Sequence, residues 1–173
     1  MPPLRVEVWS DIDCPWCATG HARLREAIAG EPAGSVEVVH RAFELHPDGQ
    51  PGTRAAHQLL KVAEHLGRGP EALEALFEAA HEERRPVGDP DVAAVVVARA
   101  AGLDAFVLRT ALDEDIGLPE VLADEEQAAR LGVRAVPFFL AGGRIAVRGA
   151  QEAPVLRRLL ATARERAGAG AGA

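Results

Sequence analysis

The chain has 173 residues, the length of about one domain, and 48% of them are hydrophobic, which excludes a disordered chain. Its 26 acidic and 19 basic side chains give a formal net charge of −7, so we expect neither nucleic acid nor an anionic membrane as a partner. Two cysteines are too few for a secreted disulfide framework, and no apolar run reaches the roughly 18 residues that cross a bilayer.

Residues 1–5 contain no basic segment followed by an apolar run, the pattern of a secretory signal. We therefore expect a cytoplasmic protein. In the cytosol a pair of thiols is more often catalytic or metal-binding than a lasting structural disulfide.

The first third of the chain predicts a βαβ unit. Residues 4–10 alternate apolar and charged side chains as a strand does, and residues 36–43 form a second apolar strand. A helix over 15–29 lies between them and begins at Pro15, whose missing N–H costs nothing in a first helical turn. The short connections predict a right-handed crossover between neighbouring strands.

The middle of the chain predicts a block of helices separated by glycine and proline. Asp89-Pro90 is typical of a helix start, with an N-cap followed by a proline in the first turn. The expected helices cover 53–66, 71–83, 90–101, 104–114 and 119–131.

The last third returns to strands. Residues 137–141 and 144–148 flank Gly142-Gly143, which predicts a two-residue hairpin. A final helix over 152–166 follows, and the glycine- and alanine-rich residues 167–173 are expected to be a flexible tail.

Both cysteines lie in Cys14-Pro15-Trp16-Cys17, directly after the first predicted strand and at the start of a helix. Two residues between the thiols let the sulfur atoms meet across the first helical turn. The free N–H groups and the partial positive charge of a helix N-terminus stabilise a thiolate there. We expect Cys14 to be exposed and nucleophilic, and Cys17, one turn further in, to resolve mixed disulfides.

Half of a zinc site is an alternative interpretation of the same spacing. His40 and His46 could supply two more ligands, but 22 residues separate Cys17 from His40, against roughly 12–15 in the usual motif. His40 also falls in a predicted strand. We therefore expect no metal.

The other histidines are expected to face water. They lie on predicted helices, mostly beside charged residues, and are His21, His57, His65 and His81.

The strand, the cysteine pair and the helix together resemble the thioredoxin superfamily. A helical block between a βαβ half and a ββα half is similar to its DsbA-type branch. The narrower resemblance, to FrnE-like cytoplasmic thiol–disulfide oxidoreductases, is carried by Asp11-Ile12-Asp13-Cys14-Pro15-Trp16-Cys17-Ala18-Thr19-Gly20, Phe43-Glu44-Leu45-His46-Pro47, Ala135-Val136-Pro137-Phe138-Phe139 and Gly149-Ala150-Gln151.

The resemblance implies an α/β fold, a thioredoxin-like βαβ–ββα core with an inserted all-helical subdomain. Residues 1–43 and 132–166 would form the core, residues 44–131 the inserted subdomain and residues 167–173 the tail.

The resemblance also implies residue roles. Cys14 matches the attacking cysteine and Cys17 the resolving one. The bond between Val136 and Pro137 would be cis and lie beside the disulfide, leaving the backbone of Val136 to pair with an extended substrate chain. Pro15 and Trp16, between the thiols, would bind substrate together with Val136 and Pro137.

Asp13 departs from the subfamily, which commonly has an apolar residue before the first cysteine. A carboxylate so close to Cys14 would oppose the helix dipole. The helical block is short and carries Ala79-Ala80-His81 where bulky aromatic residues are usual, which would widen the groove over Cys14.

The predicted function is that of a DsbA-type thiol–disulfide oxidoreductase or isomerase acting on thiol- or disulfide-bearing proteins or small molecules. It requires no cofactor beyond the redox-active pair Cys14 and Cys17. Two alternatives stay open. One is a glutathione-dependent isomerase or transferase of the same fold, in which serine usually stands at the position of Cys14. The other is a non-enzymatic interaction module whose thiols bind zinc or are vestigial.

Overall fold

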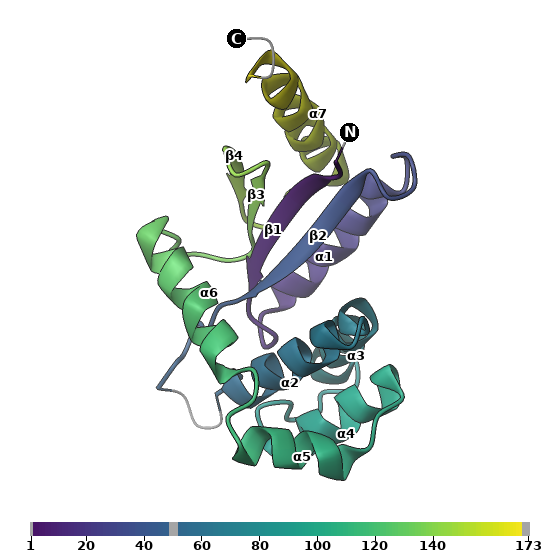
Figure 1. Cartoon of the computed structure of the whole chain (residues 1–173), viewed down its shortest axis with the longest axis vertical. Helices are drawn as coiled ribbons and strands as arrows, with labels where there is room; N and C mark the ends of the chain where they lie inside the picture. The colour runs from purple at the N-terminus through teal and green to yellow at the C-terminus, as the bar shows by residue number, and fades with distance from the viewer. Residues whose placement is uncertain (1, 49–51, 171–173) are drawn as a thin grey trace. The chain divides into compact units, whose positions relative to one another are not determined.

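Figure 1 shows the computed structural model of the chain, which describes residues 2–48 and 52–170. The chain divides into two compact units. The first comprises Met1–Ser10, Trp16–Arg41 and Val133–Ala173, and the second comprises Asp11–Pro15 and Ala42–Gly132.

The expected boundaries placed the short segment 11–15 in the thioredoxin-like core. It belongs to the second unit. Ile12 is fully buried in the apolar core of that unit, and the carboxylate of Asp11 accepts hydrogen bonds from Leu45 and Thr53. These contacts bind the segment to the second unit although it continues the first strand in sequence.

The first unit is built on a sheet in which the strand order is β2-β1-β3-β4. β1 pairs antiparallel with β3, and β3 pairs antiparallel with β4. Its elements are β1 (Leu4–Ser10), α1 (Pro15–Ile28), β2 (Val36–Ala42), β3 (Phe138–Ala141), β4 (Ile145–Arg148) and α7 (Ala153–Gly170).

One face of this sheet packs against both helices of the unit. Val6 and Val8 of β1 lie in one buried cluster with Leu24 of α1 and Leu156 of α7. Because side chains alternate along a strand, residues two apart face the same way. Helices α1 and α7 therefore cover the same face.

The alternate residues of β1 point to the opposite face. Glu7 is 8% exposed and pairs with Arg41 of β2, with 2.5 Å between Oε1 and Nη2. Trp9 is fully buried, and its ring meets Phe138 of β3 edge to face at a centroid distance of 5.9 Å. A charged pair is tolerated at this depth because each partner satisfies the other.

The hairpin between β3 and β4 differs from the expected two-residue turn. Ala141 pairs with Ile145, so three residues connect the strands. Gly142 and Gly143 both have positive φ, at 58° and 66°, and the N–H of Arg144 donates to the carbonyl of Ala141. Arg144 therefore closes the turn instead of opening the next strand.

The expected tail is also partly corrected, because α7 continues to Gly170. The helical backbone continues four residues beyond the expected end, although every second residue after Ala167 is glycine, a weak helix former. Residues 171–173 of the predicted tail lie outside the described part of the chain.

The second unit is helical, and its helices begin and end within two residues of the predicted positions. They are α2 (Arg54–His65), α3 (Gly69–His81), α4 (Pro90–Ala101), α5 (Ala105–Asp113) and α6 (Leu118–Arg130). The Asp89 side chain caps α4 as predicted, accepting from the N–H groups of Asp91 and Val92. Gly102 ends the same helix with φ of 70°, in the left-handed conformation.

An alanine-, valine- and leucine-rich core holds these helices together. It includes Leu60 of α2, Leu76 of α3, Val97 of α4 and Leu108 of α5. Helix α6 is tied to α2 by a buried ion pair between Lys61 and Asp124, 2.8 Å apart. The sequence order of a βαβ half, a helical block and a ββα half is confirmed.

Across residues 2–48 and 52–170, no helix combines the length and the apolar character needed to span a membrane.

Candidate active site

The two cysteines lie on either side of the start of α1. Cys14 is the last residue before the helix, Pro15 is its first residue, and Cys17 lies in the first turn. The N–H groups of a first helical turn have no partner within the helix, so they and the helix dipole favour negative charge on a sulfur held there.

Cys14 is buried, at 5% exposure, which corrects the expectation of an exposed thiol. Its N–H donates to the carbonyl of Asp11 at 3.3 Å, which folds the chain back in a tight turn. Ile12, inside that turn, is fully buried and draws the turn below the surface. Cys17 is also buried, with no exposed surface.

The two residues between the thiols are exposed. Pro15 lies at the surface, and 66% of Trp16 is exposed although it is the largest apolar side chain in the segment. An exposed tryptophan between the two cysteines offers a broad apolar contact surface.

Pro137 packs against α1 in the first unit. The peptide bond between Val136 and Pro137 is cis, Pro137 is buried and Val136 is half-buried. A Cβ atom on Gly20 would lie 2.7 Å from Cγ of Pro137, so only glycine permits this approach. Gly20 follows Cys17 by three residues, so Pro137 touches the helix about one turn beyond the second thiol.

The Gly149-Ala150-Gln151 segment also contacts Pro137. The N–H of Gly149 donates to the carbonyl of Pro137 at 2.7 Å, and Gly149 has a φ of 77° that favours glycine. Arg23 of α1 donates to the carbonyl of Ala150 at 2.5 Å and pairs with Glu152 at 2.6 Å. Arg23 is a site residue that sequence reasoning missed, since nothing local marks its distant partner.

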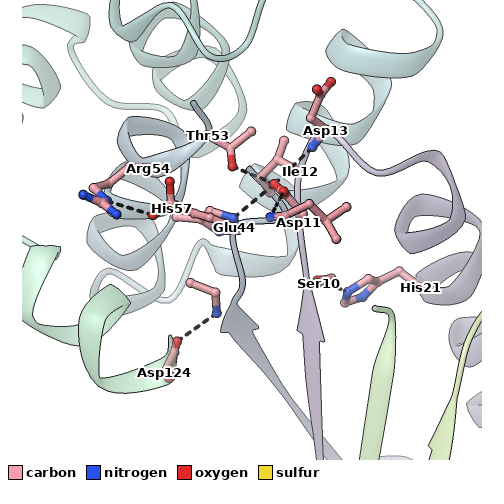
Figure 2. A network of polar contacts seen from close by, with 12 residues as sticks. Ser10, Asp11, Ile12, Asp13, His21, Glu44, Thr53, Arg54, His57 and Asp124 are labelled. Atoms are coloured by element: carbon pink, nitrogen blue, oxygen red, sulfur yellow. Dashed lines mark hydrogen bonds and ion pairs between the residues drawn. The ribbon is translucent and has the colours of Figure 1, made fainter. Parts of the chain in front are cut away.

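A buried polar cluster surrounds Asp11, three residues before Cys14 (Figure 2). The Asp11 carboxylate accepts from the hydroxyl of Thr53 at 2.6 Å and from the N–H of Leu45 at 2.7 Å. The N–H of Asp13 lies 3.4 Å from Oδ1 of Asp11, and Nε2 of His57 lies 3.6 Å from it.

Burial by itself raises the pKa of Asp11, but the nearby His57 and the hydrogen bonds from Thr53 and Leu45 lower it by more. The net pKa is below the usual value for aspartate. Asp11 is therefore an anion in the folded protein at neutral pH, held among donors instead of in water.

A second acidic group lies in the same unit. Glu44 is buried and pairs with Arg54, with 2.7 Å between Oε1 and Nε (Figure 2). Burial and the neighbouring carboxyl of Glu44 raise the pKa of Glu125 to about 7. The charge of Arg54 acts in the opposite direction on Glu125 but does not offset these two effects.

The expectation that the helix histidines face water is correct for His65 and wrong for two others. His21 is buried and its Nε2 lies 3.0 Å from the hydroxyl of Ser10 (Figure 2). Burial and the charge of Arg25 lower the pKa of His21 to about 4. His57 has no exposed surface.

His81 is half-buried, and its Nε2 lies 2.9 Å from the carbonyl of Ile12. Sequence reasoning missed these placements because a histidine next to charged residues carries no local signal of burial. In residues 2–48 and 52–170, no group of three or more His, Cys, Asp and Glu side chains is arranged to hold a metal ion.

Comparison with known proteins identifies relatives of most of the chain. The family model of the DSBA-like thioredoxin domain matches residues 5–161. The uncharacterized protein YwbO of Bacillus subtilis is 26% identical over 184 aligned positions, which cover 82% of this chain and 88% of that protein.

Solved structures show the same fold. A probable DsbA oxidoreductase from Streptomyces coelicolor is 32% identical, with a TM-score of 0.87 over 94% of this chain and 90% of that one. BdbD from Bacillus subtilis is 16% identical, with a TM-score of 0.79 over 94% of this chain and 88% of that one. The predicted fold class, a thioredoxin-like core with a helical insertion, is confirmed. The narrower FrnE-like resemblance stays a prediction.

Proposed function

Because the chain belongs to the family of DSBA-like thioredoxin domains, we propose that it is a thiol–disulfide oxidoreductase that works through Cys14 and Cys17. One observation carries the proposal. Two thiols separated by Pro15 and Trp16 stand at the first turn of α1, where the sulfurs can join and where a thiolate is stabilised.

The reaction begins when the Cys14 thiolate attacks one sulfur of a substrate disulfide. A bond forms between Cys14 and the substrate, the substrate S–S bond breaks, and the released sulfur takes up a proton. Cys17 then gives up its proton and attacks the Cys14 sulfur, which releases the second substrate sulfur as a thiol. Two electrons have passed to the substrate, and an external dithiol restores the Cys14 and Cys17 thiols by the same exchange. No metal or organic cofactor takes part in the proposed steps.

Four residues are proposed to bind substrate. Pro15 and Trp16 are exposed between the thiols, and an apolar side chain near the scissile disulfide can pack on the Trp16 ring. Val136 lies where β3 begins, and its backbone can pair with an extended substrate segment. Pro137 has no N–H to donate, so it cannot extend the β ladder at that point.

Reduction of insulin by dithiothreitol tests the proposal. We expect the protein to shorten the lag before reduced insulin precipitates, and we expect Cys14→Ser to remove the effect. A wild-type lag equal to that of dithiothreitol alone would contradict the proposed activity.

A further inference from the structure

We propose that Asp11 and Thr53 are positioning residues for Cys14: the hydroxyl of Thr53 holds the Asp11 carboxylate, and Asp11 in turn holds the turn that carries the attacking thiol (Figure 2). The inference rests on the proposed function, because it assigns a role in the chemistry of Cys14.

The hydroxyl of Thr53 does not cap the helix that Thr53 begins. Thr53 stands at the N-cap of α2, where threonine usually accepts a hydrogen bond from its own helix. No such capping bond is present, and the hydroxyl donates to Asp11 instead, at 2.6 Å. The Thr53 hydroxyl therefore binds the segment before Cys14, and the side chain does not cap α2.

The turn before Cys14 is fixed at several points. The Asp11 carboxylate is joined to the N–H of Leu45 at 2.7 Å, and the Asp11 carbonyl accepts the N–H of Cys14 at 3.3 Å. Between them, Ile12 is fully buried and its carbonyl contacts His81 at 2.9 Å. The Asp11 carboxylate, the Asp11 carbonyl and the buried Ile12 side chain together restrict the backbone at Cys14.

The charge of Asp11 also affects Cys14. A buried anion three residues from Cys14 disfavours a second negative charge on that sulfur unless donors compensate it. The titratable group that faces the Asp11 carboxylate is His57 from α2, at 3.6 Å, whereas Asp13 of the same turn approaches it only with its backbone N–H, at 3.4 Å. Losing the Thr53 donor leaves the Asp11 charge less compensated and the turn looser, and both changes disfavour the Cys14 thiolate.

The test measures alkylation of Cys14 by iodoacetamide as a function of pH, with Cys17→Ala present so that only one thiol reacts. Thr53→Val keeps the size of the side chain and removes the hydroxyl, and Thr53→Ser keeps the hydroxyl. We expect Thr53→Val to slow alkylation at pH 7 by about three- to tenfold and to move the profile to higher pH. Thr53→Ser is expected to stay within about twofold of the parent.

Urea unfolding of the same proteins separates positioning from a merely structural role. A loss of stability in Thr53→Val with an unchanged alkylation profile would overturn the inference, and so would an equal shift in Thr53→Ser. Thr53→Ala, which also lacks the hydroxyl, must reproduce the shift and serves if Thr53→Val does not fold. A shifted profile in a protein that fails to reduce insulin would support the positioning role and contradict the proposed function.

Discussion

Cys14 and Cys17 are separated by two residues but have different surroundings. The N–H of Cys14 donates a hydrogen bond to the carbonyl of Asp11 and closes a turn. Because Cys14 directly precedes α1, it lies close to the N–H groups of the first helical turn, which have no partner within the helix. Cys17 lies inside the helix with no exposed surface. This asymmetry predicts that a substrate sulfur meets Cys14 first.

Removing each thiol in turn tests that order. We expect Cys17→Ala to accumulate mixed disulfides with substrate proteins, because the Cys14 intermediate has no second thiol to release it. Cys14→Ala is the matched control and is expected to accumulate none. Non-reducing electrophoresis of cell extracts shows such adducts as bands that disappear on reduction. Equal adduct formation by both variants would contradict the assigned roles.

The buried His21 predicts a loss of stability in acid. Its pKa is lowered to about 4 in the folded protein, from a usual value near 6.5. Between these two pH values His21 is therefore protonated in the unfolded chain and neutral in the folded protein. The stabilising effect is complete above pH 6.5 and is lost as the pH falls toward 4. The stability advantage of the parent over His21→Gln should therefore shrink by on the order of 2–3 kcal/mol between pH 7.5 and pH 4.5.

Urea unfolding at the two pH values measures this difference. The raised pKa of Glu125 changes the unfolding free energy in the opposite direction over the same pH range. Because Glu125 is present in both proteins, its contribution cancels in the difference between them. His65→Gln is the control for replacing a helix histidine by glutamine, because the His65 side chain is 57% exposed. If the difference in unfolding free energy between the unmodified protein and His21→Gln does not change with pH, burial does not keep His21 neutral.

At the scale of elements, the first unit depends on a close contact between α1 and the start of β3. Gly20 brings the helix backbone against the ring of Pro137, with Phe139 also close by. The N–H of Gly149 bonds the carbonyl of Pro137, and Arg23 binds the neighbouring Ala150. Two glycines and one arginine therefore place Pro137 on the helix that carries Cys17.

Gly20→Ala is expected to disturb this contact. The added Cβ would lie 2.7 Å from Pro137 Cγ and 3.2 Å from Phe139 Cζ, and neither atom can move freely in a packed core. We expect a loss of about 1–3 kcal/mol in the free energy of unfolding and a lower rate of insulin reduction. Gly168→Ala in α7 is the matched control, since nothing lies within 4 Å of its added Cβ.

The control should be neutral or slightly stabilising, because alanine favours a helix over glycine by up to about 1 kcal/mol. Chemical denaturation gives the stabilities and the insulin assay gives the rates. If Gly20→Ala is as stable and as active as Gly168→Ala, the close approach does not matter.

At the scale of the whole molecule, each unit has an apolar core of its own. The core of the first unit joins β1, β3, α1 and α7, and the core of the second joins the helical insert to Ile12. Aromatic residues make up only 4% of the chain, so small aliphatic side chains supply most of the buried volume.

Truncating one leucine in each core tests how much that core contributes to the free energy of unfolding. Leu156→Ala in the first unit and Leu60→Ala in the second each remove a fully buried side chain. We expect each to cost about 2–5 kcal/mol of unfolding free energy, from lost transfer energy and the cavity left behind. Leu66→Ala, at a residue 56% exposed, should change it by less than about 0.5 kcal/mol. Denaturant titration of the three variants measures these changes. If Leu156→Ala or Leu60→Ala changes the unfolding free energy as little as Leu66→Ala does, that leucine does not contribute to the core as proposed.

The sequence by itself was enough to place the helices, the strands and the thiol pair. Asp89-Pro90 starts α4 because a cap and a first-turn proline act within one helical turn, and Gly102 ends it for an equally local reason. The cysteine spacing is local as well. Apolar periodicity, capping and turn chemistry depend on residues close in sequence, so they can be read before the chain folds.

Only the tertiary structure decided what surrounds those thiols. His21 and His57 look like surface residues in sequence and are buried, and Thr53 looks like a helix cap but binds Asp11, 42 residues away. The close approach of Gly20 to Pro137 spans an even longer interval. Burial and such pairings depend on which distant segments pack together, and the local pattern at either end carries no record of its partner.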